Sequence, residues 1–374
     1  MSLPSLHVFA EAASIKEIGR ELKAQTSNLI DFAETYYGAK KLKIGDMIAG
    51  LMNFRYSFGE YAPYVDDIKD TSEIFHGRLG IKTLQHSVSL GCTTLVRNAH
   101  ETPSLMGTVD WEQVGNDLSS VVFLAVLENP IHPEAPVASV AIGPAAFGLI
   151  MMNSHASVKL NRAPIPNVKD KDIDLSAITD AEYREVKKRN NNNYTLKTAF
   201  NAIVKGRPPA AYLIRHAINK NMTFEDTVDY IKKTPTCDFA IITVAGTKAG
   251  QAVTIEKRAG ESYAYSGYEA AANHWTQEGD FGKKPSLPRT LNSSLRAAAI
   301  TDETRPALYK GDHFSFANGG VVDHTTRIMV ETNVASGKMT LVTTHGRIPT
   351  SKAVSARFDG QKLCDIEHFN LEMA

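Results

Sequence analysis

Short apolar runs separated by polar turns recur through the middle of the chain. Each run has the length of a β-strand, and Asn, Pro, Gly or Ser residues bound it. Because several of these runs are continuously apolar, they predict sheets that are covered on both faces. Between residues 121 and 161 the predicted strands are 121–127, 137–142, 148–153 and 157–161.

Other parts of the chain have different patterns. From residue 6 to about residue 90 the apolar positions follow helix-like spacing. A polar stretch at 164–193 predicts a surface excursion. Two helices are predicted beyond it, one after the Pro-Pro pair at 208–209 and one from the capping-box-like residues 223–226. Paired apolar runs then predict two hairpins, 239–256 and 327–344.

The stretch from 89 to 112 carries the strongest chemical signal. Gly91 and Cys92 precede a β-branched and apolar run, a polar turn follows, and a second short apolar run ends at Asp110. This order predicts a β-hairpin. Its turn would fold the chain back and put the thiol of Cys92 and the carboxylate of Asp110 side by side.

The Gly-Cys pair permits a specific reaction. A thiolate can attack the carbonyl of the preceding residue only where the backbone bends back, and a glycine there has no Cβ to obstruct the approach. An N-to-S acyl shift and hydrolysis would break the chain between Gly91 and Cys92. Cys92 would then carry a free α-amine, whose ordinary pKa of about 7.7–8.0 suits proton transfer with a thiol of about 8.5, so one residue would be nucleophile and general base. The alternative is a small buried cysteine that opens a strand.

Charge and cysteine content restrict the classes of partner and compartment. Lys+Arg and Asp+Glu both number 41, and the resulting net charge of zero argues against nucleic acid or an anionic membrane as the main partner. Three widely spaced cysteines form no disulfide framework and fit a reducing compartment. No apolar run is long enough to predict a membrane span. The first residues lack the regions of a signal peptide, which predicts a cytoplasmic protein if they are the native beginning and a secreted or lysosome-like one if a signal has been removed.

Other kinds of chemistry have no motif in this sequence. Zinc-ligand spacing, a P-loop, the dinucleotide-binding glycine motif and the Gly-x-Ser-x-Gly elbow are all missing. We therefore expect no metal and no cofactor. A papain-like arrangement would put Cys92 at the start of a helix, whereas the β-branched residues after it favour a strand.

The 89–112 stretch resembles a known family. Cys92-Thr93-Thr94 and Asp110-Trp111 match the N-terminal nucleophile (Ntn) hydrolases of the acid ceramidase, N-acylethanolamine acid amidase and penicillin acyltransferase group, which are choloylglycine hydrolase-like. That group has Cys-Thr-Ser or Gly-Cys-Thr-Thr, a hairpin, and then Gly-Arg-Asn-x-Asp or Gly-Gln-Asn-x-Asp. The middle of the second motif departs from this pattern, because Gly107 stands at the Arg or Gln position and Thr108 at the Asn position.

The resemblance implies further site residues. Asn161, in a Leu-Asn pair, matches an active-site Asn, and the alternative is a turn residue that ends a strand. Asn273 matches an Asn that helps form the oxyanion hole, and the alternative is a turn before a helix. Arg296, or less closely Arg289, matches an arginine ahead of a helix and could equally be a solvated helix-face charge. Thr247 stands where the family has Asn in a turn.

Taken as a whole, the resemblance predicts an α+β protein with a four-layer αββα Ntn-hydrolase sandwich. Residues 1–91 would form a helical N-terminal segment that stays associated after cleavage, and residues 92–374 the Ntn-hydrolase domain. The implied activity is hydrolysis of a non-peptide amide of a small N-acyl, lipid-like substrate. One alternative is an acyltransferase, which the Gly-Cys-Thr-Thr form and the spacing of Cys92 and Asp110 slightly favour. The other is a non-catalytic ligand-binding relative, which the departures at Gly107, Thr108 and Thr247 would support.

Overall fold

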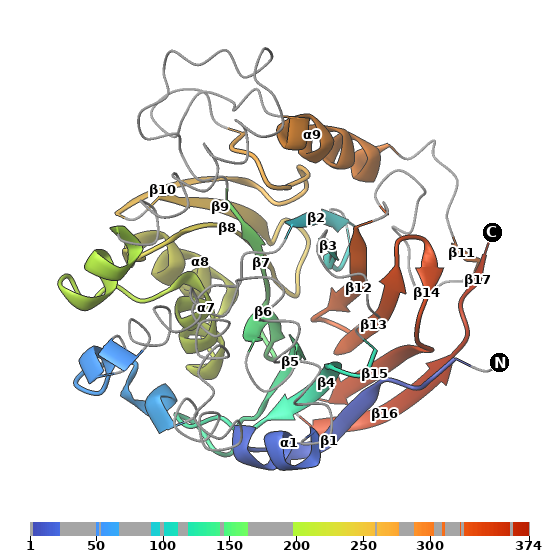
Figure 1. Ribbon diagram of the computed structural model, residues 1–374, viewed down its shortest axis with the longest axis horizontal. Helices are drawn as coiled ribbons and strands as arrows, with labels where there is room; N and C mark the ends of the chain where they lie inside the picture. Colours follow the sequence, from blue (N-terminus) through green and yellow to red (C-terminus); the bar gives the residue numbers. More distant parts are fainter. Residues whose placement is uncertain are drawn as a thin grey trace, which may run out of the picture.

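A computed structural model of the chain has a mixed α/β architecture built on two β-sheets (Figure 1). The apolar runs predicted as strands form strands, and the two helices predicted after the 208–209 pair form helices. The polar stretch at 164–193, predicted as an excursion, lies outside the described residues. The structure describes residues 3–22, 50–51, 54–66, 91–97, 101–110, 119–142, 146–163, 197–258, 260–276, 288–302, 309–310, 322, 325–359 and 362–373.

The first sheet has eight strands in the order β1-β4-β5-β6-β7-β8-β9-β10. Neighbouring strands are antiparallel except that β1 runs parallel to β4 at the edge. The long meander from β4 to β10 follows the order of the apolar runs in the sequence. The strands are β1 (His7–Ala13), β4 (Val122–Leu127), β5 (Val137–Ile142), β6 (Ala146–Met152), β7 (Ser157–Arg162), β8 (Phe239–Ala245), β9 (Ala252–Arg258) and β10 (Glu261–Ser266).

The second sheet has seven strands in the order β16-β15-β13-β12-β3-β2, with β14 paired to β13 off this path. The predicted 89–112 hairpin is its β2–β3 edge, and the predicted 327–344 hairpin is β12–β13. A separate short pair joins β11 and β17. The strands are β2 (Gly91–Arg97), β3 (Ser104–Asp110), β12 (Thr326–Asn333), β13 (Lys338–His345), β14 (Ile348–Pro349), β15 (Ala353–Asp359), β16 (Lys362–Phe369), β11 (Tyr309–Lys310) and β17 (Glu372–Met373).

The N-terminal segment differs from the helical stretch that the sequence predicted. Its first element is the strand β1, which pairs with the otherwise open edge of β4 and satisfies the backbone groups there. Helical structure begins only at α1 (Ile15–Glu21), where Ser14 and Glu17 form a capping box. A short 3₁₀ helix, η2 (Ala62–Tyr64), follows. Much of the remaining N-terminal segment lies outside the described residues.

The apolar core lies in layers. One cluster joins side chains of β4, β5 and β6 to side chains of β12, β13 and β15, so the two sheets face each other. A second cluster packs α1, α7 (Ala210–Asn219) and α8 (Phe224–Lys233) on the other face of the first sheet. A third packs α9 (Pro288–Thr301) on the outer face of the second sheet (Figure 1). This layering is consistent with an Ntn-type sandwich.

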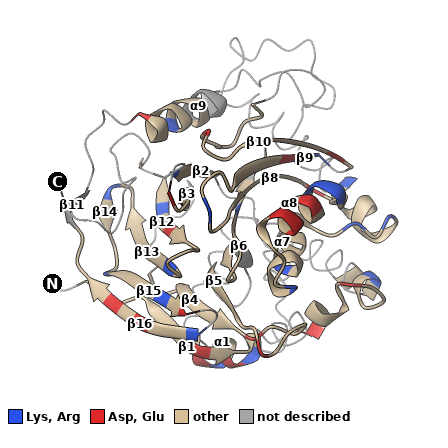
Figure 2. Ribbon diagram, turned by 180° about the vertical axis from the view of Figure 1, so that it is seen from behind, with Lys and Arg blue, Asp and Glu red and all other residues tan. Residues whose placement is uncertain are grey.

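Charged residues of both signs are interspersed on outer elements such as α8 and β16 (Figure 2). The described parts of the chain contain no helix that is both long and apolar enough to cross a membrane.

Candidate active site

The β2–β3 hairpin sets the position of the predicted nucleophile. Gly91 pairs with Asp110 and Cys92 with Val109, so the two strand ends meet, but the prediction that the Cys92 thiol and the Asp110 carboxylate lie side by side is wrong. Side chains alternate between the faces of a strand. The thiol of Cys92 therefore lies among the side chains between the two sheets, while the carboxylate of Asp110 lies on the opposite face, towards α9.

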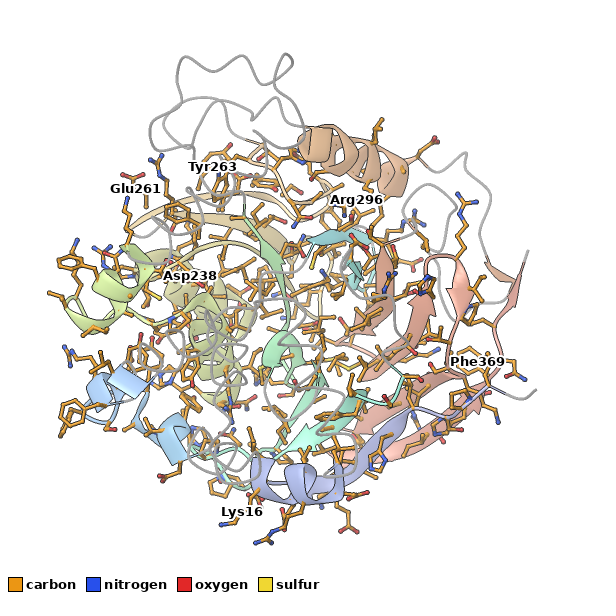
Figure 3. The ribbon with its side chains drawn as sticks, in the orientation of Figure 1. Lys16, Asp238, Glu261, Tyr263, Arg296 and Phe369 are labelled. Atoms are coloured by element: carbon orange, nitrogen blue, oxygen red, sulfur yellow. The ribbon has the colours of Figure 1, made fainter. Side chains whose placement is uncertain are left out.

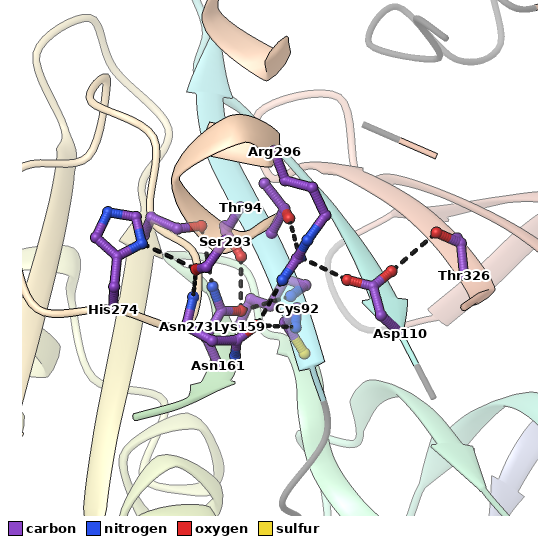
Figure 4. Close-up of polar contacts among 12 residues, drawn as sticks. Cys92, Thr94, Asp110, Lys159, Asn161, Asn273, His274, Ser293, Arg296 and Thr326 are labelled. Carbon is purple, nitrogen blue, oxygen red and sulfur yellow. Dashed lines mark hydrogen bonds and ion pairs between the residues drawn. The ribbon is translucent and has the colours of Figure 1, made fainter. Parts of the chain in front are cut away.

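The backbone nitrogen of Cys92 has a specific polar partner. It donates a hydrogen bond of 2.8 Å to Oδ1 of Asn273, which follows β10 (Figure 4). The Asn273 nitrogen in turn donates to Ser293 Oγ of α9 at 2.7 Å, and Ser293 Oγ also lies 2.8 Å from His274 Nδ1. Asn273 is thus anchored to α9 at its backbone and faces Cys92, the predicted nucleophile, with its side chain.

Arg296 of α9, labelled in Figure 3, joins the two strands to Asn273 (Figure 4). Its Nη1 donates to Asp110 Oδ2 at 2.6 Å and to the hydroxyl of Thr93, and its Nη2 donates to Asn273 Oδ1 at 3.0 Å. Thr326 of β12 donates to the second carboxylate oxygen of Asp110 at 2.9 Å. Arg296 and Asp110 are both buried, so this is a desolvated ion pair in which every charge has hydrogen-bond partners.

Asn161 reaches the site from β7, in the opposite sheet. Its Oδ1 accepts from Lys159 Nζ at 2.6 Å and from Thr94 Oγ1 at 2.7 Å, and its Nδ2 donates to the carbonyl of Ala271 at 3.2 Å. Backbone hydrogen bonds between Thr94 and Ala271 tie the loop after β10 to β2. The same loop therefore carries Asn273 and positions Asn161.

The structure brings together all the site residues that the resemblance had implied. Gly91, Cys92 and Asp110 come from the hairpin, Asn161 from β7, Asn273 from the loop after β10 and Arg296 from α9. The side chain of Arg289, the less close alternative, lies outside the described ones.

Sequence reasoning missed Lys159. This lysine is buried, its ammonium lies within hydrogen-bonding reach of the Cys92 thiol, and burial lowers its pKa against the opposing effects of Cys92 and Asp110. The available signal was a lysine inside the predicted strand 157–161, which belongs to a group of strands that the sequence had predicted to form covered sheets. A buried lysine is costly and therefore points to a local function.

The three departures from the family pattern have different surroundings. A Cβ on Gly107 would collide with the side chain of Lys159 and lie 2.7 Å from the carbonyl oxygen of Thr93. The buried hydroxyl of Thr108 has no hydrogen-bond partner among the described residues. Thr247 lies in the β8–β9 turn, where its nitrogen donates to Gln251 Oε1 at 2.9 Å. The departure at Gly107 therefore leaves room for the side chain of Lys159.

Comparison with known proteins gave matches among solved structures but not among family models or curated proteins. No protein-family model matches the chain, and no curated protein matches it significantly. Among solved structures, the chain is similar to a Caenorhabditis elegans N-acylethanolamine-hydrolyzing acid amidase (NAAA) ortholog, at 12% sequence identity and a TM-score of 0.44. The match covers 65% of this chain and 93% of that one. That protein belongs to the group that the Cys-Thr-Thr and Asp-Trp motifs resemble.

Proposed function

We propose that the protein is an Ntn-type cysteine amidase of αββα architecture, which cleaves itself between Gly91 and Cys92 and then hydrolyses a non-peptide amide of an N-acyl substrate. The observation that carries this proposal is the hydrogen bond from the Cys92 nitrogen to Asn273 Oδ1. This nitrogen is the atom that cleavage would convert to an α-amine. It already has an acceptor that α9 and the Arg296–Asp110 ion pair hold in place.

The self-cleavage step uses the thiol and the preceding carbonyl. Cys92 Sγ attacks the carbonyl carbon of Gly91, a C–S bond forms, the C–N bond breaks, and the nitrogen takes up a proton. Water then hydrolyses the thioester, which leaves a carboxylate on Gly91 and a free amine and thiol on Cys92. The amine would serve as general base for the thiol in later turnovers.

The surrounding residues support amide chemistry in later turnovers. Asn273 Oδ1 can accept from the free amine as it accepts from the present backbone nitrogen, which leaves the amine lone pair for the thiol proton. The amide N–H groups of Asn161 and Asn273 are the candidate donors to a developing oxyanion, since preorganised donors of this kind are typically worth about 10²–10³ in rate. Asp110 acts through Arg296, which it neutralises and orients.

The decisive experiment is intact-mass analysis with N-terminal sequencing of the purified protein, before and after incubation in acid. We expect two fragments, residues 1–91 and 92–374, which elute together in size-exclusion chromatography, with a new N-terminus at Cys92. A fluorogenic N-acyl amide should be hydrolysed only by cleaved protein.

Variants of two buried cysteines distinguish the loss of a reactive thiol from the loss of a buried side chain. Cys92→Ala should remain one chain and lack amidase activity. Cys237→Ala is the matched control, because Cys237 is also buried but packs among Tyr56, Tyr61 and Tyr212, and it should cleave like the wild type. A wild-type chain that stays uncut under all conditions would overturn the proposal and favour a ligand-binding protein.

A further inference from the structure

The proposed self-cleavage needs a base that takes the proton of the Cys92 thiol. In the uncut chain Cys92 cannot supply that base itself. In the uncut chain the Cys92 nitrogen belongs to a peptide bond, and a peptide nitrogen is not a base. The α-amine that would serve in later turnovers exists only after cleavage. Some other group must therefore take the thiol proton in the first reaction.

Lys159 lies where such a group is needed. It projects from β7 into the space between the sheets, towards Cys92 of β2 (Figure 4). Its Nζ donates to Asn161 Oδ1 at 2.6 Å and lies within hydrogen-bonding reach of the thiol. No ion pair holds this lysine among the described residues, so its immediate hydrogen-bond partners are a neutral amide and the nucleophile.

The opposite strand is shaped around this lysine. Gly107 of β3 faces it, and a Cβ at that position would overlap Lys159 Cε and lie 2.7 Å from Lys159 Cδ. The glycine φ is not in the left-handed region, so the backbone conformation alone does not require glycine there. The absence of a side chain at 107 instead provides the room that the lysine occupies.

We propose that Lys159 is the proton-transfer residue of the self-cleavage reaction, taking the thiol proton of Cys92 in the uncut chain and returning it to the leaving nitrogen. This inference rests on the proposed function. A neutral Lys159 amine accepts the Sγ proton, which leaves a thiolate beside an ammonium. The thiolate adds to the Gly91 carbonyl carbon, the C–N bond breaks, and the ammonium gives its proton to the nitrogen that becomes the Cys92 amine. The lysine ends neutral, so the step balances.

The electrostatics support a lysine that can lose its proton. Burial lowers the Lys159 pKa and the positive charge of Arg296 lowers it further, while Cys92 and Asp110 raise it, and the net direction is downward. Those three groups, on α9, β2 and β3, are the titratable or charged side chains acting on Lys159 in the described structure. A buried lysine with a lowered pKa is the usual form of a catalytic lysine base.

The test follows self-cleavage by intact mass over a pH series, in freshly purified full-length protein. Lys159→Met keeps the length of the side chain without a base, and we expect cleavage to slow by about 10²-fold or more and to lose the wild-type pH profile. Lys159→Gln keeps a donor for Asn161 and carries the same expectation where the Met variant does not fold. The matched control is Lys257→Met, which removes another buried lysine whose Nζ donates to Ile231 O and Ser262 Oγ, and it should cleave at the wild-type rate.

A second readout separates proton transfer from a structural role. Once cleaved, the protein has its α-amine, so the part of Lys159→Met that does become cut should lose much less amidase turnover than cleavage rate. Equal losses in both reactions would show a merely structural lysine and would overturn the inference. Folded Lys159→Met or Lys159→Gln that cleaves at the wild-type rate and pH profile would also overturn it and leave the proposed function standing. An uncut wild type would instead contradict the proposed function.

Discussion

At the scale of single residues, the site depends on Arg296. Its planar guanidinium contacts β2 through Thr93, β3 through Asp110 and the loop after β10 through Asn273. Arginine suits this position because its donors are arranged in a fixed fork and it remains charged when buried. The side chain therefore connects β2, the Asp110 carboxylate and the residue that binds the Cys92 nitrogen.

Removing Arg296 should damage stability and cleavage for different reasons. Arg296→Met leaves Asp110 buried without its partner, which should cost about 3–5 kcal/mol in the free energy of unfolding, measured by urea denaturation. The double variant Arg296→Met with Asp110→Leu should recover part of that loss, because no buried carboxylate remains. It should not recover self-cleavage, since Asn273 still lacks its donor. A double variant as unstable as the single one would contradict this account.

At the scale of elements, the β12–β13 hairpin holds the β2–β3 hairpin of the site in the second sheet. β12 pairs with β3 along its length and supplies Thr326 to Asp110. Its turn closes at Gly337, which has a φ of +66°, and the Phe358 nitrogen donates to the Gly337 carbonyl at 2.8 Å. The turn therefore fixes the hairpin against β15, the next strand of the sheet.

Two glycines with positive φ allow the cost of backbone strain to be measured apart from the cost of steric overlap. Gly337→Ala would bring its Cβ into the carbonyl of Phe358, whereas a Cβ on Gly250, which has a φ of +82°, would meet no heavy atom within 4 Å. Gly337→Ala should lose roughly 2–4 kcal/mol of unfolding free energy, from strain plus overpacking, and Gly250→Ala only about 1 kcal/mol from strain. Urea denaturation of both variants checks this, and equal losses would exclude the steric contribution of Phe358.

At the scale of the whole molecule, the N-terminal segment is joined to the rest by contacts that do not need an intact 91–92 bond. β1 pairs with β4, and an aromatic cluster joins residues 54–66 to α7. In that cluster Tyr64 is fully buried and its hydroxyl lies 3.2 Å from His216 Nδ1. These contacts predict that the two parts stay associated after the proposed cleavage.

The cluster also predicts acid sensitivity. Burial lowers the His216 pKa to about 4, from an ordinary value of 6.5, although Glu60 opposes the shift. Between pH 6.5 and 4 the unfolded chain therefore binds a proton that the folded one does not, and stability falls as pH falls. His216→Phe should flatten this part of the curve of urea midpoint against pH. His132→Phe, at a solvent-accessible histidine, is the control, and an unchanged slope in His216→Phe would contradict the assignment.

Much of the fold could be predicted from local pattern. The strands β4 to β9, the β2–β3 hairpin, the helices α7 and α8 and the β12–β13 hairpin follow from apolar periodicity and turn residues, which act between neighbours in sequence. The strands β10, β15 and β16 were not predicted. The strand β1 was missed because the open edge of β4, far along the chain, decides its conformation. Intrinsic preference in such a segment is a weak guide once a tertiary partner is present.

By itself, the sequence determined the β2–β3 hairpin and pointed to Cys92 as the candidate nucleophile, because Gly91, Cys92 and Asp110 lie within one local unit. The family resemblance added Asn161, Asn273 and Arg296 as single residues with no stated partners. Only the tertiary structure decided that the Cys92 nitrogen faces Asn273, that Asp110 binds Arg296, and that Lys159 fills the room left by Gly107. Those contacts join strands of two sheets and a helix, and such pairings depend on how buried surfaces pack, which no local pattern encodes.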